Sequence, residues 1–246
     1  MRPVVHFEIA GSDRGKLCTF YENVFGWHIQ QDDSMDYGMV DTHGGKGFNG
    51  GITTAQEGAT NGVIVYVAVD ELQPFLDKAV TLGGEIVAPI MEIPNVVTFA
   101  LFKDPHGNVV GLVKGDGQGP QVSAGDGVPV TWFEIMGKDA SIQDFYRELF
   151  EWKITDMAPA PGYGTVGWEE WGFGGGIGTI PGHHQSYVTI YPEVADVAAT
   201  LKKVVEFGGS VVMEPTDMPE VGVQTAAFTD PDGNMIGAYK QIPMKA

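Results

Sequence analysis

The chain repeats itself. Residues 4–13 (VVHFEIAGSD) match residues 130–139 (VTWFEIMGKD) at six of ten positions, and residues 102–111 (FKDPHGNVVG) match residues 228–237 (FTDPDGNMIG) equally well. The aromatic positions of FYENVFGW also recur in FYRELFEW. The offset stays at 125–126 residues throughout, so the order of the motifs is kept as well. This pattern predicts two copies of one structural unit.

A glycine-rich segment with almost no apolar residue separates the copies. We predict a first domain at residues 1–115, a linker at 116–127 and a second domain at 128–246. A linker of this composition is expected to act as a flexible tether that spans roughly 20 Å. Each copy is long enough to bury a core of its own.

Within each copy, the periodicity predicts the order strand-helix-strand-strand-strand, twice. Val5, Phe7 and Ile9 alternate with polar residues, which is the period of a strand with one apolar face. The helix that follows is expected to have Ser12 or Asp13 as its N-cap in the first copy and to follow Asp139 in the second, and its apolar residues recur at helical spacing. A double glycine ends the second helix of each copy, and a DPxGN turn joins the last two strands. The fold class is therefore α+β.

Composition excludes several classes of partner. The formal net charge is −18, which repels nucleic acid and anionic membrane surfaces. The single cysteine, Cys18, excludes an internal disulfide and a zinc site with several cysteines. The chain shows neither a signal-peptide pattern nor an apolar run of about 18 residues. We expect a cytoplasmic protein with no nucleic-acid or membrane partner.

The ordered motifs HxEIxxxD, FYxxxFxW and FxDPxGN, each present in both copies in this or a slightly varied form, resemble the vicinal-oxygen-chelate superfamily of glyoxalase, bleomycin-resistance and dioxygenase-like proteins. The resemblance is greatest to bacterial members with two tandem domains. It implies that paired βαβββ units form two curved mixed sheets, each with a concave face, or cup, that holds the site. Metal-dependent members bind a divalent ion there through His or Gln and Glu side chains.

The metal ligands of that family are mostly missing from this sequence. His6 stands at the position of the first-strand histidine, but its counterpart is Trp132. The last-strand glutamate is replaced by Gly111 and Gly237. We therefore expect no metal site and no cofactor, and we expect the two glycines to leave room for a ligand. The remaining ligand positions hold Gly50-Gly51 and Gly175-Gly176, and Ile64 and Thr189.

Strand alternation predicts which side chains lie on the concave faces. These side chains are mostly apolar and aromatic, with one carboxylate in each cup. The carboxylates, Glu8 and Glu134, are the candidate catalytic groups, although each could instead brace its cup by hydrogen bonding. Trp27 and Trp152 are expected in the core, His183-His184 in solvent, and Cys18 without a role as nucleophile. The predicted ligand-binding residues are His6, Tyr66, Trp132, Met136, Tyr191 and Tyr239.

Three functions are compatible with this pattern. The first is a protein that binds a small, partly aromatic or apolar molecule without the usual metal site. The alternative is a lyase- or isomerase-type enzyme of the glyoxalase superfamily that uses Glu8 or Glu134, or a non-standard metal site. In a third, one copy is only a scaffold. The protein is expected to act as a monomer whose halves pair within the chain, or as a homodimer.

Overall fold

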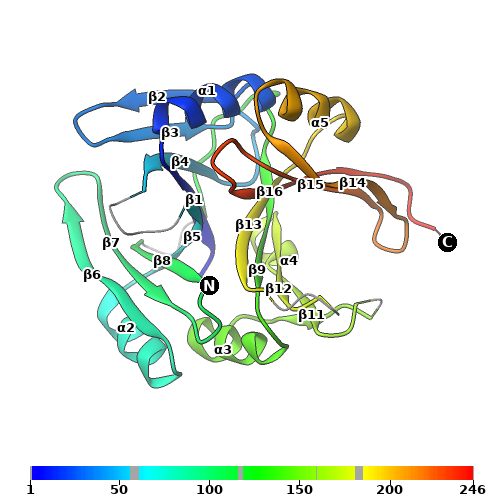
Figure 1. Ribbon diagram of the computed structural model, residues 1–246. Helices are drawn as coiled ribbons and strands as arrows, with labels where there is room; N and C mark the ends of the chain where they lie inside the picture. The colour runs from blue at the N-terminus through cyan, green and yellow to red at the C-terminus, as the bar shows by residue number, and fades with distance from the viewer. Residues whose placement is uncertain (1, 56–60, 116–118, 159, 181–184, 246) are drawn as a thin grey trace. The chain divides into compact units, whose positions relative to one another are not determined.

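The computed structural model describes residues 2–55, 61–115, 119–158, 160–180 and 185–245 (Figure 1). Both repeats follow the predicted order. The first repeat contains β1 (Val4–Gly11), α1 (Arg14–Phe25), β2 (His28–Asp32), β3 (Tyr37–Asp41), β4 (Asn49–Thr54), β5 (Gly62–Val69), α2 (Leu72–Thr81), β6 (Glu85–Ile93), β7 (Val97–Lys103) and β8 (Val109–Lys114).

The second repeat adds one short helix, α4, to the same order. It contains β9 (Val130–Met136), α3 (Ser141–Phe150), β10 (Thr155–Asp156), β11 (Tyr163–Val166), α4 (Trp168–Trp171), β12 (Gly174–Gly178), β13 (Tyr187–Pro192), α5 (Val197–Glu206), β14 (Ser210–Met218), β15 (Val223–Thr229) and β16 (Met235–Gln241). The predicted α+β fold, built of tandem βαβββ units that form curved mixed sheets, is confirmed.

The chain forms two compact units, and each takes segments from both repeats. Unit 1 consists of Met1–His6, Ile64–Pro120 and Trp132–Val188, and unit 2 of Phe7–Val63, Gln121–Thr131 and Thr189–Ala246. Strands β1, β5, β9 and β13 each contribute residues to both units. The compact units therefore do not coincide with the two copies seen in the sequence.

Unit 1 contains the strand orders β5-β8-β7-β6 and β10-β11-β12-β9 together with helices α2 and α3. The pairs β5–β8 and β12–β9 are parallel, and the other pairs of these two groups are antiparallel. The rings of Phe102 and Phe145 lie 6.1 Å apart in the core. The ring of Phe75 on α2 stacks on that of Phe150 on α3, so apolar faces from both repeats share one core.

Unit 2 is built from the matching set of strands and helices. It contains the strand orders β2-β3-β4-β1 and β14-β15-β16 together with helices α1 and α5. Phe20 and Phe25 of α1 pack against Phe228 of β15, and all three side chains are buried. The two units thus repeat one packing arrangement with different segments of the chain.

A buried tyrosine–aspartate pair joins the repeats inside each unit. In unit 1 the hydroxyl of Tyr146 on α3 donates to Asp104 Oδ2 at 3.0 Å, and in unit 2 the hydroxyl of Tyr21 on α1 donates to Asp230 Oδ2 at 2.9 Å. Asp104 Oδ1 also accepts the backbone N–H groups of His106 and Asn108, at 2.9 Å each. The DPxGN turns join the last two strands of each repeat as predicted, and each turn also binds a helix of the other repeat through its aspartate.

The ends of the helices largely follow the sequence signals. Asp13 caps α1 by accepting the N–H of Lys16, and Gly83 and Gly208 adopt the left-handed conformation after α2 and α5. The start of α3 differs from the expected one. Ala140 precedes the helix with helical backbone angles, while Asp139 accepts the N–H and hydroxyl of Ser141. Asp139 thus organises the turn before the helix.

The glycine-rich linker is not a free tether over its described part, so that expectation is wrong. Gly45 N–H donates to the Ser123 carbonyl at 3.0 Å, and Gly127 N–H donates to the His43 carbonyl at 2.9 Å. A Cβ at Gly125 would lie 2.6 Å from the carbonyl oxygen of His43. Glycine here permits close backbone packing. A glycine-rich composition alone does not show whether glycines serve close packing or flexibility. Residues 116–118 of the linker lie outside the described ranges.

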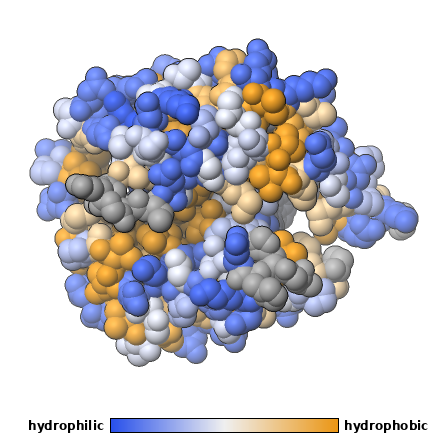
Figure 2. All heavy atoms as spheres, viewed as in Figure 1, coloured by the Kyte–Doolittle hydropathy of each residue, from blue (hydrophilic) through white to orange (hydrophobic). Residues whose placement is uncertain are grey.

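Strands β6 and β14 stand at the ends of their strand orders and are largely exposed. Figure 2 shows hydrophobic residues at the surface in this region of β6. Each strand has a register shift that spans a proline, Pro89 in β6 and Pro215 in β14. Proline lacks an N–H and a bulge interrupts the ladder, so both edges are protected against further strand pairing.

Candidate functional site

The predicted faces of the two first strands are recognisable in the burial pattern. In β1, Phe7 and Ile9 are fully buried, whereas His6, Glu8 and Ala10 are partly exposed. In β9, Trp132 is partly exposed, but Glu134 and Met136 are 7% and 1% exposed. Met136 therefore lies in the interior, and its carbonyl accepts from Asn108 Nδ2 at 3.0 Å.

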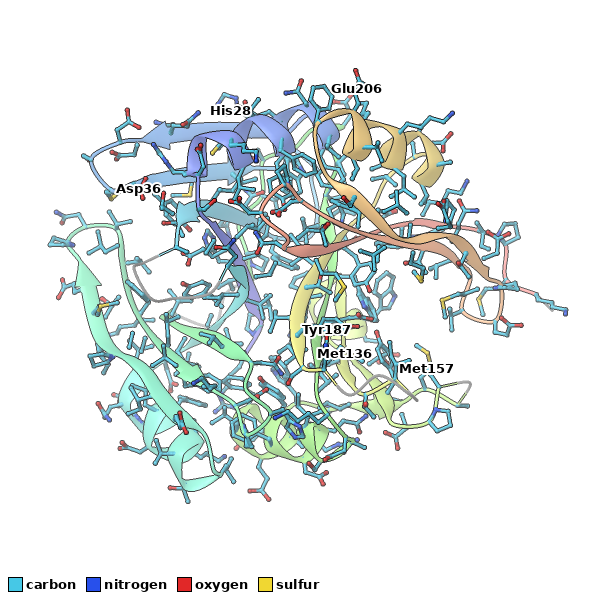
Figure 3. All side chains as sticks on the ribbon, in the orientation of Figure 1. His28, Asp36, Met136, Met157, Tyr187 and Glu206 are labelled. Carbon is cyan, nitrogen blue, oxygen red and sulfur yellow. The ribbon has the colours of Figure 1, made fainter. Side chains whose placement is uncertain are left out.

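Glu134 is the centre of a hydrogen-bonded aromatic group in unit 1. The hydroxyl of Tyr163 donates to Glu134 Oε1 at 2.7 Å. Tyr187, at the start of β13 and labelled in Figure 3, lies close enough to the same carboxylate for its charge to raise the pKa of the phenol. A carboxylate placed among aromatic rings thus accepts a hydrogen bond from Tyr163, as a buried acceptor requires.

Burial and the nearby carboxylate both raise the pKa values of Tyr163 and Tyr187. Burial, and then the charge of Glu134, hold the pKa of Tyr163 well above its usual value. The same two causes raise the pKa of Tyr187. Both phenols therefore stay protonated over the physiological range, and Tyr163 donates its proton to Glu134.

Glycine on β12 makes this geometry possible. Gly176 is paired with Glu134 on the neighbouring strand, and a Cβ at Gly176 would overlap the hydroxyl of Tyr163. With no side chain there, the Tyr163 ring lies across β12 and its hydroxyl reaches Glu134. The sequence reasoning missed Tyr163 and Tyr187. The run Gly174-Gly175-Gly176 was the available signal, because consecutive strand glycines often mark the close approach of another group.

Two tryptophans extend the group toward the surface. The ring centroids of Trp132 and Trp168 are 6.3 Å apart with an interplanar angle of 55°. Trp168, on α4, is 53% exposed. A Cβ at Gly174 would lie 2.6 Å from the Trp132 ring and 3.1 Å from the Trp168 ring. We call Trp132, Glu134, Tyr163, Trp168 and Tyr187 the Glu134 cluster.

A second aromatic group in unit 1 comprises His6, Tyr66 and Phe99, which we call the His6 wall. The rings of His6 and Tyr66 meet edge to face at 5.8 Å, and those of Tyr66 and Phe99 at 6.3 Å. Burial lowers the pKa of His6 to about 4. The imidazole is therefore neutral near pH 7.

The expectation that Gly111 and Gly237 leave room for a ligand is wrong. A Cβ at Gly111 would overlap the Tyr66 ring, and one at Gly237 would overlap the Tyr191 ring. The tyrosines of the neighbouring strands fill the space, since a ring packs well over a strand glycine. In unit 2, Tyr239 bonds Thr131 Oγ1 at 2.7 Å and Glu193 Oε2 at 3.3 Å, and burial raises the pKa of Tyr239 to about 12.

Glu8 belongs to unit 2, where the first repeat has a related arrangement. The ring of Tyr37 lies over Gly51 as the ring of Tyr163 lies over Gly176. His6 belongs to unit 1. The exposed tryptophan helix has no match in this repeat, where the equivalent residues 42–47 are irregular.

The remaining expectations concern core residues and loops. Trp27 and Trp152 are buried as predicted. Cys18 is buried too, and burial raises the pKa of its thiol to about 11, so it is poorly suited to act as a nucleophile. His183-His184 lies outside the described residues. No helix within the described ranges is both long and apolar enough to cross a bilayer.

Comparison with known proteins places the fold in a family. The model of the Glyoxalase/Bleomycin resistance protein/Dioxygenase superfamily matches residues 4–112 and 137–237, so the chain belongs to this superfamily. The putative glyoxylase CFP32 of Mycobacterium tuberculosis is 26% identical over 253 residues, covering 97% of this chain and 94% of that protein. The anthracycline biosynthesis protein DnrV of Streptomyces peucetius is 27% identical, with 92% and 89% covered.

A solved structure supports the fold. The Mn(II)-bound glyoxalase from Novosphingobium aromaticivorans superposes with a TM-score of 0.68 at 11% identity, covering 100% of this chain and 86% of that one. At this identity the likeness concerns the fold alone. It leaves open whether this chain has the residues to bind such an ion.

The side chains at the family's ligand positions do not fit a divalent ion. Gly111 and Gly237 lie beneath tyrosine rings, Trp132 replaces a histidine, and the Thr189 hydroxyl donates to the Met235 carbonyl at 2.7 Å. No group of three or more His, Cys, Asp or Glu side chains that could hold a metal occurs among the described residues. Three protein ligands are the usual minimum for a catalytic zinc-type site.

Proposed function

We propose that this protein binds a small, partly aromatic or apolar molecule at the Glu134 cluster without a metal ion. The supporting observation is the combination of a buried carboxylate that accepts from Tyr163 with a tryptophan pair that reaches the surface. Apolar and aromatic walls with a few placed polar groups are typical of small-molecule sites. The His6 wall is a further apolar surface of the same kind, with His6 neutral.

Composition supports the rest of the assignment. At −18, the chain repels polyanions, so we propose neither a nucleic-acid nor a membrane partner. A single cysteine fits a reducing compartment, so we propose a cytoplasmic location. We propose further that it acts as a monomer or a homodimer. Sedimentation at several protein concentrations separates these two states.

Ligand binding is tested by tryptophan fluorescence and calorimetry with a panel of bicyclic aromatic compounds. We expect sub-millimolar dissociation constants that a chelator does not change. Trp168→Ala should weaken binding without changing the melting temperature, because the side chain is 53% exposed. Val212→Ala, at an equally exposed apolar residue on β14, is the matched control and should bind normally. No binding by any compound, or binding abolished by the chelator, would contradict the proposal.

The alternative function is lyase- or isomerase-type chemistry, and the hydrogen bond between Tyr163 and the buried Glu134 favours it. A carboxylate hydrogen-bonded to a phenol can exchange a proton with a bound group. Turnover of a ligand that falls at least a hundredfold in Glu134→Gln, with binding retained, would establish the enzyme. Glu8→Gln tests the equivalent role in the first repeat. Stoichiometric metal in the purified protein, lost in His6→Ala, would instead support a non-standard metal site.

A further inference from the structure

Unit 2 contains a cavity whose lining includes no residue of the Glu134 cluster. Its volume is about 240 Å³, and its walls come from three segments that are far apart in the sequence, within residues 44–46, 125–129 and 193–195. The first segment belongs to the loop before β4, the second to the end of the glycine-rich linker and the residues before β9, and the third to the connection between β13 and α5. Both repeats and the linker therefore build this cavity together.

Backbone contacts hold the walls of the cavity. The N–H of Gly127 donates to the carbonyl of His43, which joins the linker to the loop of the first repeat. The N–H of Glu193 donates to the carbonyl of Pro129 at 2.9 Å, which joins the third segment to the second. A Cβ at Gly44 would lie 2.5 Å from the Cβ of Pro129. The three segments are thus fixed against one another by their main chains.

The cavity is lined by two opposite charges that form an ion pair. Lys46 Nζ lies 2.6 Å from Glu193 Oε2, and the two side chains are 48% and 19% exposed. The same oxygen accepts from the hydroxyls of Thr131 and Tyr239, at 3.3 Å each. An ammonium group has three donors and a carboxylate has two acceptor oxygens. Among the described residues, Lys46 uses one of its donors and Glu193 one of its oxygens, so each can bind a further group.

The rest of the lining has a charged part and an apolar part. Asp126 adds a second carboxylate, which is exposed. An anion alone would be repelled by the two carboxylates, and a cation alone would be repelled by Lys46. A ligand that carries both charges can pair with each of them, and an apolar body would cover the apolar part. The apolar lining residues are Pro129, Val194 and Ala195.

We propose that this cavity binds a small zwitterion, namely an α-amino acid with an aliphatic side chain. The carboxylate of the ligand pairs with Lys46, its ammonium group pairs with Glu193 Oε1 and Asp126, and its side chain contacts the apolar lining. The volume is below the roughly 300–1,000 Å³ of sites for drug-sized molecules, which fits a ligand of this size. The inference is separate from the proposed binding function, because the Glu134 cluster belongs to unit 1.

Three probes with the same carbon chain test the inference by isothermal titration calorimetry on the full chain. They are L-leucine, 4-methylpentanoate, which lacks the ammonium group, and 3-methylbutylamine, which lacks the carboxylate. A charged hydrogen bond at a partly exposed site gives roughly a tenfold difference, so we expect leucine to bind at least that much more tightly than either analogue.

Variants assign each charge of the ligand to its partner. Lys46→Met should weaken leucine binding about tenfold without weakening that of 3-methylbutylamine. Glu193→Gln should weaken leucine binding to a similar extent without weakening that of 4-methylpentanoate. Lys103→Met is the matched control, because Lys103 is 42% exposed and pairs with Glu85 at 3.6 Å in unit 1. It should bind leucine as the unaltered protein does.

The outcomes distinguish this cavity from the Glu134 cluster. Failure of leucine to bind at millimolar concentration, or equal affinity for the three probes, overturns the inference and leaves the binding of aromatic compounds standing. Leucine binding that is unchanged in both Lys46→Met and Glu193→Gln overturns it as well. An aromatic compound bound at the Glu134 cluster should leave the leucine affinity as it is. Competition between the two would assign both ligands to one site and contradict a separate cavity.

Discussion

Single glycines decide what occupies the inner faces of the sheets. A strand glycine removes a side chain from one face, and in this chain a tyrosine ring from a neighbouring strand lies over the vacated backbone. A glutamate at such a position would have to displace the ring before it could bind an ion. Glycine in place of the family's glutamate therefore removes a metal ligand, and it also lets a tyrosine ring occupy the space of that ligand. The glycine–tyrosine pairs are Gly111 with Tyr66, Gly237 with Tyr191, Gly51 with Tyr37, and Gly176 with Tyr163.

The packing at Gly111 predicts a clear effect on stability. Gly111→Ala should destabilise the protein by about 1–3 kcal/mol, because the added methyl overlaps the Tyr66 ring in a close-packed wall. Gly62→Ala is the matched control: no atom lies within 4 Å of its added Cβ, and its effect should stay within about 0.5 kcal/mol. Denaturant unfolding measures both changes. Equal stability of the two variants would show that the ring is not held over Gly111.

The lowered pKa of His6 predicts that the protein loses stability in mild acid. Its pKa falls from 6.5 to about 4 on burial, so the unfolded chain takes up the proton first as the pH is lowered. The stability due to neutral His6 is complete above pH 6.5 and is lost as the pH falls toward 4. Between these limits we expect a decrease of roughly 1–3 kcal/mol in the free energy of unfolding. His6→Gln should show a shallower decrease over the same range, measured by urea unfolding. Parallel curves for the two proteins would refute this assignment.

At the scale of helices and strands, periodicity predicted most of the architecture. The alternation of β1 and the cap at Asp13 depend on neighbours in the sequence, and both were read correctly. The partner of Tyr21 could not be read in this way, because Asp230 lies 209 residues further along the chain. Tyr163 and Tyr187 were missed for the same reason. Their place beside Glu134 exists only once β11, β12, β9 and β13 lie next to one another, and neither stands in a motif of its own.

The tyrosine–aspartate pairs should contribute equally in the two units. Tyr21→Phe and Tyr146→Phe each remove a donor from a buried aspartate, at an expected cost of about 1–3 kcal/mol. Asn23→Ala, on the exposed face of α1, loses only an exposed bond to the Thr19 carbonyl and is the control. Thermal and denaturant unfolding measure the three variants. A Tyr→Phe variant as stable as the control would mean that its aspartate is satisfied by the turn alone.

At the scale of the whole molecule, the sequence repeat and the compact units describe different divisions of the chain. The repeats end and begin around residues 116–127, where we placed the domain boundary from the sequence. Each compact unit, however, joins a helix of the first repeat to one of the second, α2 with α3 and α1 with α5. Apart from the short α4, a repeat by itself therefore contains one helix from each unit, together with only part of the core that each helix needs.

Division of the chain between residues 117 and 118 distinguishes the two descriptions. Fragment 1–117 carries nearly all of the first-repeat part of unit 1 and lacks Trp132–Val188, which completes that core. We expect neither fragment to unfold cooperatively as a monomer, because each leaves apolar helix faces uncovered that would drive self-association. Mixing the two fragments should restore the cooperative transition and the ligand binding of the intact chain, followed by calorimetry and sedimentation. A monomeric fragment 1–117 with a sharp transition of its own would show that residues 1–115 form an autonomous domain. The apolar faces of α2 and α3 would then not depend on each other for stability.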